Sequence, residues 1–144
     1  MKVKRATTQD IVMRANVTKM FPGSWHHVYI TISGMIRDTE HYRTFRSNNT
    51  FLLYEIVDKE EGIAAGPVFS IDAPRIRAEC YVEFAKALQK AGFKHFQSYA
   101  DNPLTVRLLE EAGFQVGVGK SMYNHKKLEE KEIHVLLSNE GEQP

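Results

Sequence analysis

The sequence predicts an α/β (α+β) fold in which helices flank a mixed central sheet. Three observations support this class. Runs rich in aromatic and β-branched residues, which favour strands, alternate along the chain with amphipathic runs at helical spacing. Two neighbouring strand runs are joined by a short charged connection, which favours an antiparallel hairpin. The expected order is strand, helices, hairpin, helix, strand, helix and two strands, which places helices on the faces of one sheet.

The first elements are a strand and two helices. Residues 1–6 favour a short strand, and residues 7–20 favour a helix because hydroxyl and acidic side chains stand at its start. The Phe-Pro-Gly sequence at residues 21–23 ends that helix. Residues 24–42 show both helical spacing and strand alternation, and we favour a helix.

The middle of the chain predicts the hairpin. Residues 43–50 are polar and rich in Asn, which predicts a loop. Residues 51–57 then form a strand, residues 58–62 a turn, and residues 63–71 a second strand. Gly66-Pro67 interrupts the second strand, and because proline cannot donate to a sheet, a bulge or an edge position is expected there.

The last third alternates helices and strands. Residues 78–91 place apolar side chains on one helical face, and Gly92 suits the end of that helix. The remaining expected elements are a strand over 93–99, a helix from Pro103, a strand over 115–122, a charged loop over 124–131 and a final strand over 133–137.

Size and composition favour one soluble domain over residues 1–144. A chain of 144 residues can bury one core but is short for two, and 42% hydrophobic with 26% charged residues is ordinary for a globular protein. Residues 138–144 form a polar tail that we expect to fray. The net charge of +1 provides no global field that would attract nucleic acid or an anionic membrane, so only a local basic patch remains open.

The cysteine content and the N-terminal composition favour the cytoplasm. Cys80 is the only cysteine, which excludes an intrachain disulfide and a site built on several cysteines. Six histidines show no metal-binding pair, so no metal is expected. Residues 1–5 lack the apolar core of a signal peptide, and no window reaches the roughly eighteen apolar residues that span a membrane.

Residues 102–114 are the most informative segment of the chain. Asn102 can cap a helix with its side-chain oxygen, Pro103 suits the first helical position, and Gly113 suits the left-handed residue that follows the end. The apolar side chains between them recur at helical spacing, and Phe114 begins a strand-like run. The segment therefore predicts a short helix with both ends marked.

The same segment resembles the Asn-x-x-Ala-x-x-Leu-Tyr-Glu-x-x-Gly-Phe signature of the GCN5-related N-acetyltransferase (GNAT) superfamily. The matching positions are Asn102, Leu108, Glu110, Gly113 and Phe114. Thr105 replaces the family's Ala, and Leu109 replaces its Tyr, the frequent general acid. The resemblance implies an acyl-CoA N-acyltransferase-like fold, with acetyl-CoA or another acyl-CoA as cosubstrate and no metal.

A second family element is Arg/Gln-x-x-Gly-x-Gly/Ala, whose backbone N–H groups approach the coenzyme A pyrophosphate. Residues 75–80 occupy the place of this element in the present sequence. Ala78 and Cys80 stand at the two positions where the family normally has glycine, and Glu79 adds a negative charge. The resemblance implies this set of cofactor-binding residues: Ile71, Arg75, Ile76, Arg77, Ala78, Glu79, Cys80 and Asn102.

The resemblance also implies direct attack of an amine on the thioester, with the carbonyl oxygen polarised by a backbone N–H of the strand ending at Ile71. A carboxylate would take the amine proton through water, and Glu55 and Asp72 are the candidates near the central strands. The thiolate must then be protonated. Because the family's tyrosine is missing, Tyr99 and Tyr123 are the candidate acids.

Several partners and functions remain open at this point. The acceptor would be an amine on a small molecule or a protein. A second hypothesis is a catalytically silent accessory or structural protein, similar to the acetyltransferase-like internal proteins of short-tailed phages, which also lack the glycines. Exposed strand edges near the C-terminus would permit a homodimer.

A third hypothesis is nucleic-acid modification. His41-Tyr42 and the later Tyr99-Ala100-Asp101 are similar to elements of the acetyltransferase-like Mom DNA-modification proteins of phages. Basic residues near the first pair could contact phosphates, although a solvated helix face explains them more simply. These residues are Arg37, Arg43 and Arg46.

Overall fold

The computed structural model describes residues 2–19, 23–100, 102–118 and 131–136. Its helices are α1 (Thr8–Thr18), α2 (Trp25–Arg37), α3 (Pro74–Lys90) and α4 (Pro103–Glu111). Its strands are β1 (Tyr42–Ser47), β2 (Thr50–Asp58), β3 (Ile63–Ala65), β4 (Val68–Ser70), β5 (His95–Ala100), β6 (Gln115–Val118) and β7 (Lys131–Leu136).

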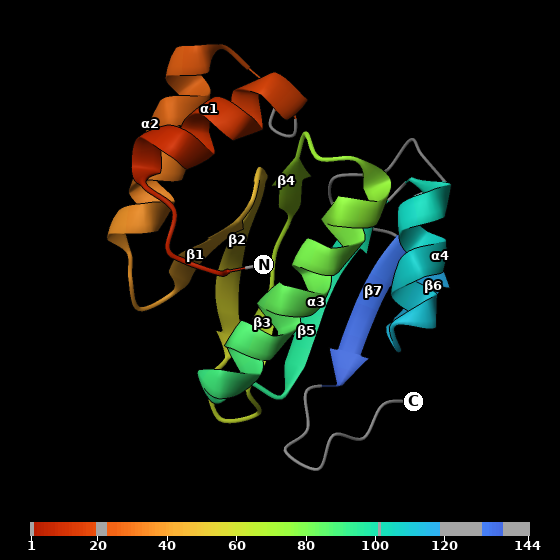
Figure 1. The fold of residues 1–144 in the computed structure, drawn as a ribbon. Coiled ribbons are helices and arrows are strands. Elements are labelled where there is room, and N and C mark those ends of the chain that lie inside the picture. The colour runs from red at the N-terminus through yellow and green to blue at the C-terminus, as the bar shows by residue number, and fades with distance from the viewer. Residues whose placement is uncertain (1, 20–22, 101, 119–130, 137–144) are drawn as a thin grey trace.

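The strands form one mixed sheet (Figure 1). Its order is β1-β2-β3-β5-β7-β6, and β4 pairs with β2 beside β3. β3 and β5 are parallel, and the other described pairs are antiparallel. Helix α3 connects β4 to β5, and the parallel pairing requires such a crossover.

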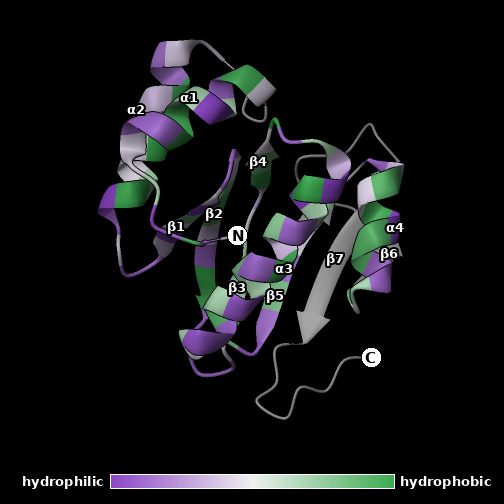
Figure 2. Cartoon of the chain, in the orientation of Figure 1, coloured by the Kyte–Doolittle hydropathy of each residue, from purple (hydrophilic) through white to green (hydrophobic). Residues whose placement is uncertain are grey.

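Helices cover both faces of the N-terminal half of the sheet. Because successive strand residues face opposite sides, β2 contributes to two cores. Phe51 and Leu53 pack with α1 and α2 on one face, whereas Leu52 and Tyr54 pack with α3 on the other. Apolar and polar residues alternate along α3 in Figure 2, as expected for a helix that covers a sheet.

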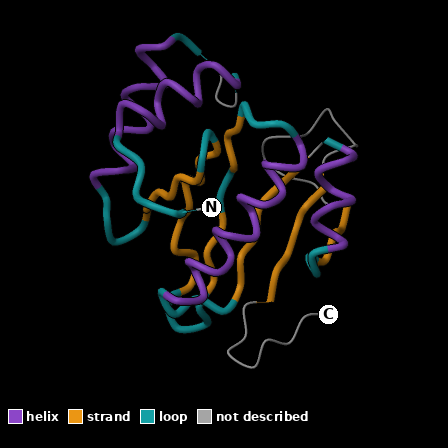
Figure 3. The backbone as a smooth tube through the Cα atoms, viewed as in Figure 1, coloured by secondary structure: helices purple, strands orange, loops and turns teal. Residues whose placement is uncertain are grey.

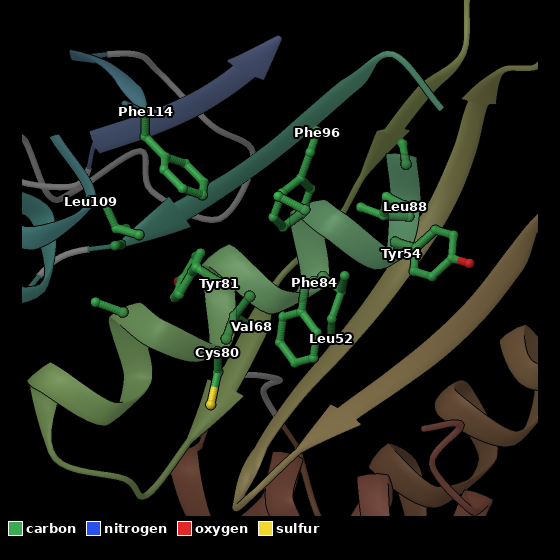
Figure 4. Close-up of a cluster of buried hydrophobic side chains, with 14 of the residues drawn as sticks. Leu52, Tyr54, Val68, Cys80, Tyr81, Phe84, Leu88, Phe96, Leu109 and Phe114 are labelled. Atoms are coloured by element: carbon green, nitrogen blue, oxygen red, sulfur yellow. The ribbon is translucent and has the colours of Figure 1, made fainter. Parts of the chain in front are cut away.

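The larger core lies between the sheet and helices α3 and α4. Aromatic and aliphatic side chains from both layers meet there (Figure 4), and Tyr81 contacts Phe114 edge-on with ring centroids 6.4 Å apart. The side chains labelled in that view are Leu52, Tyr54, Val68, Cys80, Tyr81, Phe84, Leu88, Phe96, Leu109 and Phe114.

Much of the expected order is confirmed. Residues 24–42 contain a helix, residues 51–57 and 63–71 form a hairpin interrupted at Gly66-Pro67, and a strand follows over the end of 93–99. Helix α4 begins at Pro103, and Gly113 takes a φ of 98°, the left-handed region expected just past its end.

The loop predicted over residues 43–50 is wrong, because most of it is strand β1. Its last residue, Ser47, pairs with Thr50 across a tight turn in which Asn48 has a φ of 53°. The polar composition misled the prediction, since the two side chains of strand β1 in the buried class, Thr44 and Ser47, are both hydroxyl-bearing. Thr44, for example, is buried and donates its hydroxyl to the Ala6 carbonyl at 3.3 Å.

Three other boundaries near the N-terminal half also differ. Residues 2–6 form no strand and contribute a single bridge, between Lys4 and Arg46. Helix α1 ends at Thr18, because Lys19 adopts the left-handed conformation with a φ of 53°. Helix α3 begins at Pro74 instead of Ala78, so the first residues of the expected cofactor loop are helical.

The C-terminal predictions are only partly within the described residues. Strand β6 covers the first residues of the strand expected over 115–122, and β7 begins at Lys131, two residues before the strand expected over 133–137. Most of the loop expected over 124–131 and the tail over 138–144 lie outside the described residues. None of the described helices combines the length and the apolar composition of a membrane-spanning segment.

Candidate functional site

The sheet divides where β3 gives way to β4. Residues 63–65 of β3 pair in parallel with residues 95–97 of β5. After the interruption at residues 66 and 67, the chain continues as β4, which pairs with β2 alone among the described strands, while β5 continues beside β7. Figure 3 shows the short non-strand segment between β3 and β4. The sheet is therefore split between β4 and the end of β5.

Gly66 and Ser98 explain why the strands separate. The Gly66 N–H still donates to the Gln97 carbonyl at 3.1 Å, but its own carbonyl accepts the Ser98 hydroxyl at 2.7 Å instead of a backbone N–H. A Cβ atom at Gly66 would lie 1.9 Å from the Leu53 oxygen, so the chain approaches β2 more closely here than any side chain would permit. The parallel pairing ends at this contact.

One edge of β4 has no partner strand among the described residues. Hydrogen bonds alternate between the two edges of an antiparallel strand. The Pro67 carbonyl accepts from the Leu53 N–H at 3.2 Å, so it faces β2. The N–H and carbonyl groups of Val68 and Ser70 consequently face the other way, toward β5, where no described strand pairs with β4.

The open edge of β4 leads directly to the start of α3. Only residues 71–73 separate the two elements. Helix α3 begins at Pro74 without a side-chain cap, and the Arg75 and Ile76 N–H groups have no carbonyl within the helix to bond. The helix dipole adds positive character at this end. The unpaired edge of β4 thus leads directly to the N-terminus of α3, where an anion could bind.

Asp72 holds the β1–β2 turn against the end of β4. Its carboxylate accepts hydrogen bonds from the Asn48 side chain at 2.7 Å, the Asn49 N–H at 3.0 Å and the Thr50 hydroxyl at 2.7 Å. The Ser70 hydroxyl lies 2.6 Å from that of Thr50 and accepts from the Asp72 N–H at 3.0 Å. Both carboxylate oxygens of this buried side chain are therefore occupied by the turn.

Arg75 and Arg77, the two arginines in the predicted cofactor-binding set, differ in how far their side chains are held by the protein. Arg77 donates through Nη2 to the Asp72 carbonyl at 3.0 Å, and its buried Nε atom has no hydrogen-bond partner. Arg75 is exposed beside the uncapped helix end. Of the two guanidinium groups, that of Arg75 is better placed to reach a bound anion.

The glycine-replacing residues lie inside helix α3. Ala78 and Cys80 are buried in the core, whereas Glu79 is exposed. The Cys80 thiol donates to the Ser47 carbonyl at 3.3 Å, and burial raises its pKa. Leu109, which stands in place of the family's tyrosine, is also fully buried.

The remaining predicted residues that the structure describes lie on different elements. Glu55 is exposed on β2 and pairs across the sheet with Ala65, the residue before Gly66. Ile71 is exposed, and its N–H faces the Asn49 carbonyl at 3.5 Å. Asn102 caps α4, accepting from the N–H groups of Leu104 and Thr105 at 3.0 and 3.1 Å. Tyr99 lies on β5, and Tyr123 lies outside the described residues.

The structure does not bring together the residues of the nucleic-acid hypothesis. His41 and Tyr42 stand at the start of β1, whereas Tyr99 lies on β5, and β2 and β3 separate these strands. The His41 ring instead pairs with the Asp38 carboxylate at 2.9 Å, which raises the pKa of His41 through that hydrogen bond and the adjacent charge. Asp101 lies outside the described residues.

Val68, Ser70 and Ser98 were not predicted as site residues. The sequence predicted a bulge or an edge position at Gly66-Pro67, because proline cannot donate to a sheet, but it did not predict that the sheet splits there. Which backbone groups face β5 depends on the pairing register, and the sequence carries no local signal for it. Among the described residues, no group of three or more His, Cys, Asp or Glu side chains could hold a metal ion.

No protein-family model matches the sequence, and no curated protein matches it. Solved structures do match. The spermidine/spermine N-acetyltransferase SpeG from Vibrio cholerae, in a mutant form, has a TM-score of 0.72 and 13% identity, covering 98% of this chain and 99% of that chain. The yncA protein from Salmonella typhimurium, solved with acetyl-CoA, has a TM-score of 0.67 and 12% identity, covering 100% and 98%.

A third match is a protein assigned to the GNAT family from Desulfovibrio desulfuricans, with a TM-score of 0.67 and 10% identity over 95% of this chain and 99% of that chain. Similarity at these identities establishes the fold. The chain has the acyl-CoA N-acyltransferase-like fold of the GNAT superfamily, as residues 102–114 predicted.

Proposed function

We propose that this chain, which has the GNAT fold, is an acyl-CoA-dependent N-acyltransferase that transfers an acetyl group to a primary amine. One observation carries the proposal: the open edge of β4 runs directly into the uncapped start of α3. That combination suits an extended ligand that carries amides along its length and negative charge at one end. Acetyl-CoA has both features, in its pantetheine arm and its pyrophosphate.

The binding roles follow from the positions of the groups. The N–H and carbonyl groups of Val68 and Ser70 would bond the pantetheine amides, as a neighbouring strand would. The first-turn N–H groups of α3 would receive the pyrophosphate, helped by the helix dipole and by exposed Arg75. In this assignment the pyrophosphate is bound by backbone N–H groups at the start of α3 and not by the buried residues 78 and 80.

The chemical roles need a polarised carbonyl, a base and an acid. A β4 N–H that faces the split, that of Val68 or Ser70, is suited to polarise the thioester carbonyl, whereas the Ile71 N–H faces the other way. The amine nitrogen forms the new bond to the carbonyl carbon, the carbon–sulfur bond breaks, and the thiolate accepts a proton.

Glu55 fits the role of base better than Asp72. Glu55 is exposed and pairs opposite Ala65, beside the point where the sheet splits, so a water could link it to the amine. Asp72 has both oxygens occupied by the β1–β2 turn. Tyr99 and Tyr123 remain the proposed proton donors to the thiolate.

The acceptor is proposed to be a small amine. The matched SpeG structures are spermidine N-acetyltransferases, which makes polyamines the first compounds to test. A protein amine is the other acceptor class, and both would present an unprotonated nitrogen to the carbonyl.

The test is release of coenzyme A from acetyl-CoA in the presence of a panel of primary amines that includes spermidine, with mass spectrometry of the acetylated product. We expect amine-dependent release, lowered about 100-fold by Glu55→Gln if its carboxylate is the general base. Tyr99→Phe and Tyr123→Phe identify the acid, since only the variant of the true donor should slow turnover. Absence of amine-dependent release with the whole panel would contradict catalysis.

One observation favours a second candidate, a catalytically silent binding or accessory protein. Leu109 is fully buried where the family has its tyrosine, and Ala78 and Cys80 are enclosed in the core. A silent protein would still bind coenzyme A along β4, or would bind nothing there, and would release no coenzyme A with any amine. Binding measured without turnover therefore separates the two candidates.

A further inference from the structure

Helix α2 has an outward side that is unusual for a surface helix. Residues 25–36 contain no Asp, Glu, Lys or Arg, although a helix on the surface of a sheet normally carries charges on its outward side. Val28 and Ile32 face the core. Trp25, Tyr29 and Ile30 instead face solvent, and each exposes more than half of its surface.

Helix α1 extends the same apolar surface. Met13 and Val17 are exposed by 49% and 55%. A groove of about 640 Å³ lies between the two helices. Its described lining comes from α1 and α2, namely Thr8, Gln9, Val12, Met13, Trp25, His26 and Tyr29. Because no described lining residue belongs to the sheet or to α3, the groove is separate from the split.

We propose that this surface binds a second copy of the chain. We call it the α1–α2 face and define it by its exposed apolar side chains, Met13, Val17, Trp25, Tyr29 and Ile30. A two-fold dimer places each such side chain against the same surface of the other copy. Their protruding groups would fill the groove of the partner.

The size of the face suits such a contact. Half-exposed side chains of this kind each present on the order of 100 Å². Together they present on the order of 500 Å², which is more than half of the roughly 800 Å² that each partner contributes to a standard interface. The polar residues at the margin of the groove, such as Gln9 and His26, supply the surrounding rim.

The charges of the face favour a second copy over a charged partner. In a two-fold contact each of these side chains meets the same surface of the other copy, and none of them carries a charge that would have to be buried without a partner. The net charge of +1 adds almost no repulsion between whole molecules. An acidic or basic partner would find no complementary charge among these side chains.

Gly34 gives the partner room to approach. It lies one turn after Ile30 on the exposed side of α2, and a Cβ atom at this position would have no neighbour within 4 Å. Glycine lowers helix stability at such a site, so its presence is easier to understand if another backbone comes close there. This contact extends the interface along α2.

Trp25 makes the proposal directly measurable, because it is the only tryptophan in the chain. We would measure sedimentation velocity and tryptophan emission of the full chain from low micromolar to several hundred micromolar. We expect a monomer–dimer equilibrium, with an emission maximum that shifts to shorter wavelength as the dimer forms and excludes water from the indole.

Two variants test the face itself. Ile30→Lys places a charge in the proposed contact and should weaken dimerisation about tenfold or more, because an unpaired charge is costly to bury. Val57→Lys is the matched control, since Val57 is equally exposed but lies on β2 outside the face, and it should leave the dimer unchanged. Gly34→Arg should also weaken the dimer, while circular dichroism confirms that each variant remains folded.

Three results would overturn the proposal. The chain could remain monomeric at every concentration. It could dimerise with equal affinity as wild type and as Ile30→Lys, which would place the contact elsewhere, for example at a sheet edge. Finally, the emission could be shifted independently of concentration and revert on exhaustive dialysis, which would show that a small molecule occupies the groove.

Discussion

Gly66 is the residue on which the geometry of the split depends. Its backbone passes so close to β2 that a Cβ atom would meet the Leu53 oxygen at 1.9 Å. Beyond this point the Gly66 carbonyl accepts a hydrogen bond from the Ser98 hydroxyl instead of from a backbone N–H of β5. Two small residues therefore separate β4 from β5 and leave the outer edge of β4, with the backbone of Val68 and Ser70, without a partner strand among the described residues.

Gly66→Ala and Gly34→Ala should change stability in opposite directions. The first substitution forces a side chain into backbone and should lower the free energy of unfolding by about 3 kcal/mol, as in severe overpacking. The second adds a methyl group to open space on an exposed helix and should raise it by about 0.5–1 kcal/mol. Urea unfolding at low protein concentration measures both, and equal effects would contradict the described backbone path.

His41 should titrate above its ordinary pKa of 6.5, chiefly because its ring donates to the Asp38 carboxylate. Since the folded pKa is raised, the pair stabilises the fold fully below pH 6.5 and loses this contribution as the pH rises through the folded value. NMR titration of the His41 ring measures the shift. Asp38→Asn should return the pKa toward 6.5.

Glu40→Gln is the matched control for that titration. Glu40 acts on His41 only through its charge and contributes less than Asp38, so removing it should lower the pKa only slightly. A titration midpoint that is the same in Asp38→Asn and in the wild type would show that the pair does not form in solution.

At the scale of elements, the β1–β2 hairpin is attached to the end of β4 by one side chain. Asp72 accepts from three donors of residues 48–50, and the Ser70 and Thr50 hydroxyls extend the network. The turn thereby fixes where β4 ends and where α3 begins, which positions the proposed pyrophosphate site.

Asp72→Asn should destabilise the fold more than Asp58→Asn. Replacing the Asp72 carboxylate puts an amide donor against groups that already donate, and should cost about 1.5–3 kcal/mol, the range for hydrogen bonds to a charged group. Asp58 accepts one N–H, that of Glu61, in an exposed turn, and its change should cost under about 1 kcal/mol. Thermal unfolding compares the variants, and similar losses would refute the assigned role of Asp72.

The sequence predicted the elements whose signals are local. Helix α4 carries its cap, its first-position proline and its terminal glycine within residues 102–113, so no distant contact was needed to recognise it. Strand β1 lacks such a signal, because its buried Thr44 and Ser47 are polar and are satisfied or enclosed by other elements. The sequence predicted that α3 begins at Ala78 instead of Pro74, because residues 74–77 suit either a loop or the first turn of a helix.

At the scale of the whole molecule, β2 joins the two halves of the fold. Its alternate residues enter the core under α1 and α2 and the core under α3, so the helices on both faces are fixed to one strand. The proposed functions use different regions of this arrangement. The split lies between β4 and β5, and the α1–α2 face lies on helices that do not line it.

The candidate site could be located from the sequence only in outline. Gly66-Pro67 indicated an interrupted strand, and Arg75 stands beside the helix end that the resemblance implied. The backbone groups that face the split follow from the register of β2 with β4, a non-local property that no motif records. Similarly, the resemblance placed Ala78 and Cys80 in the cofactor-binding set although the helix predicted over residues 78–91 includes them, and both are buried in the α3 core.

Calorimetric titration with acetyl-CoA tests the central claim, that the open edge of β4 and the start of α3 form an acyl-CoA site. We expect binding at micromolar affinity, weakened about tenfold by Arg75→Glu, since that change opposes the pyrophosphate charge. Arg107→Glu is the matched control, because Arg107 is exposed on α4. No binding at millimolar acetyl-CoA, or equal binding by both variants, would contradict the account.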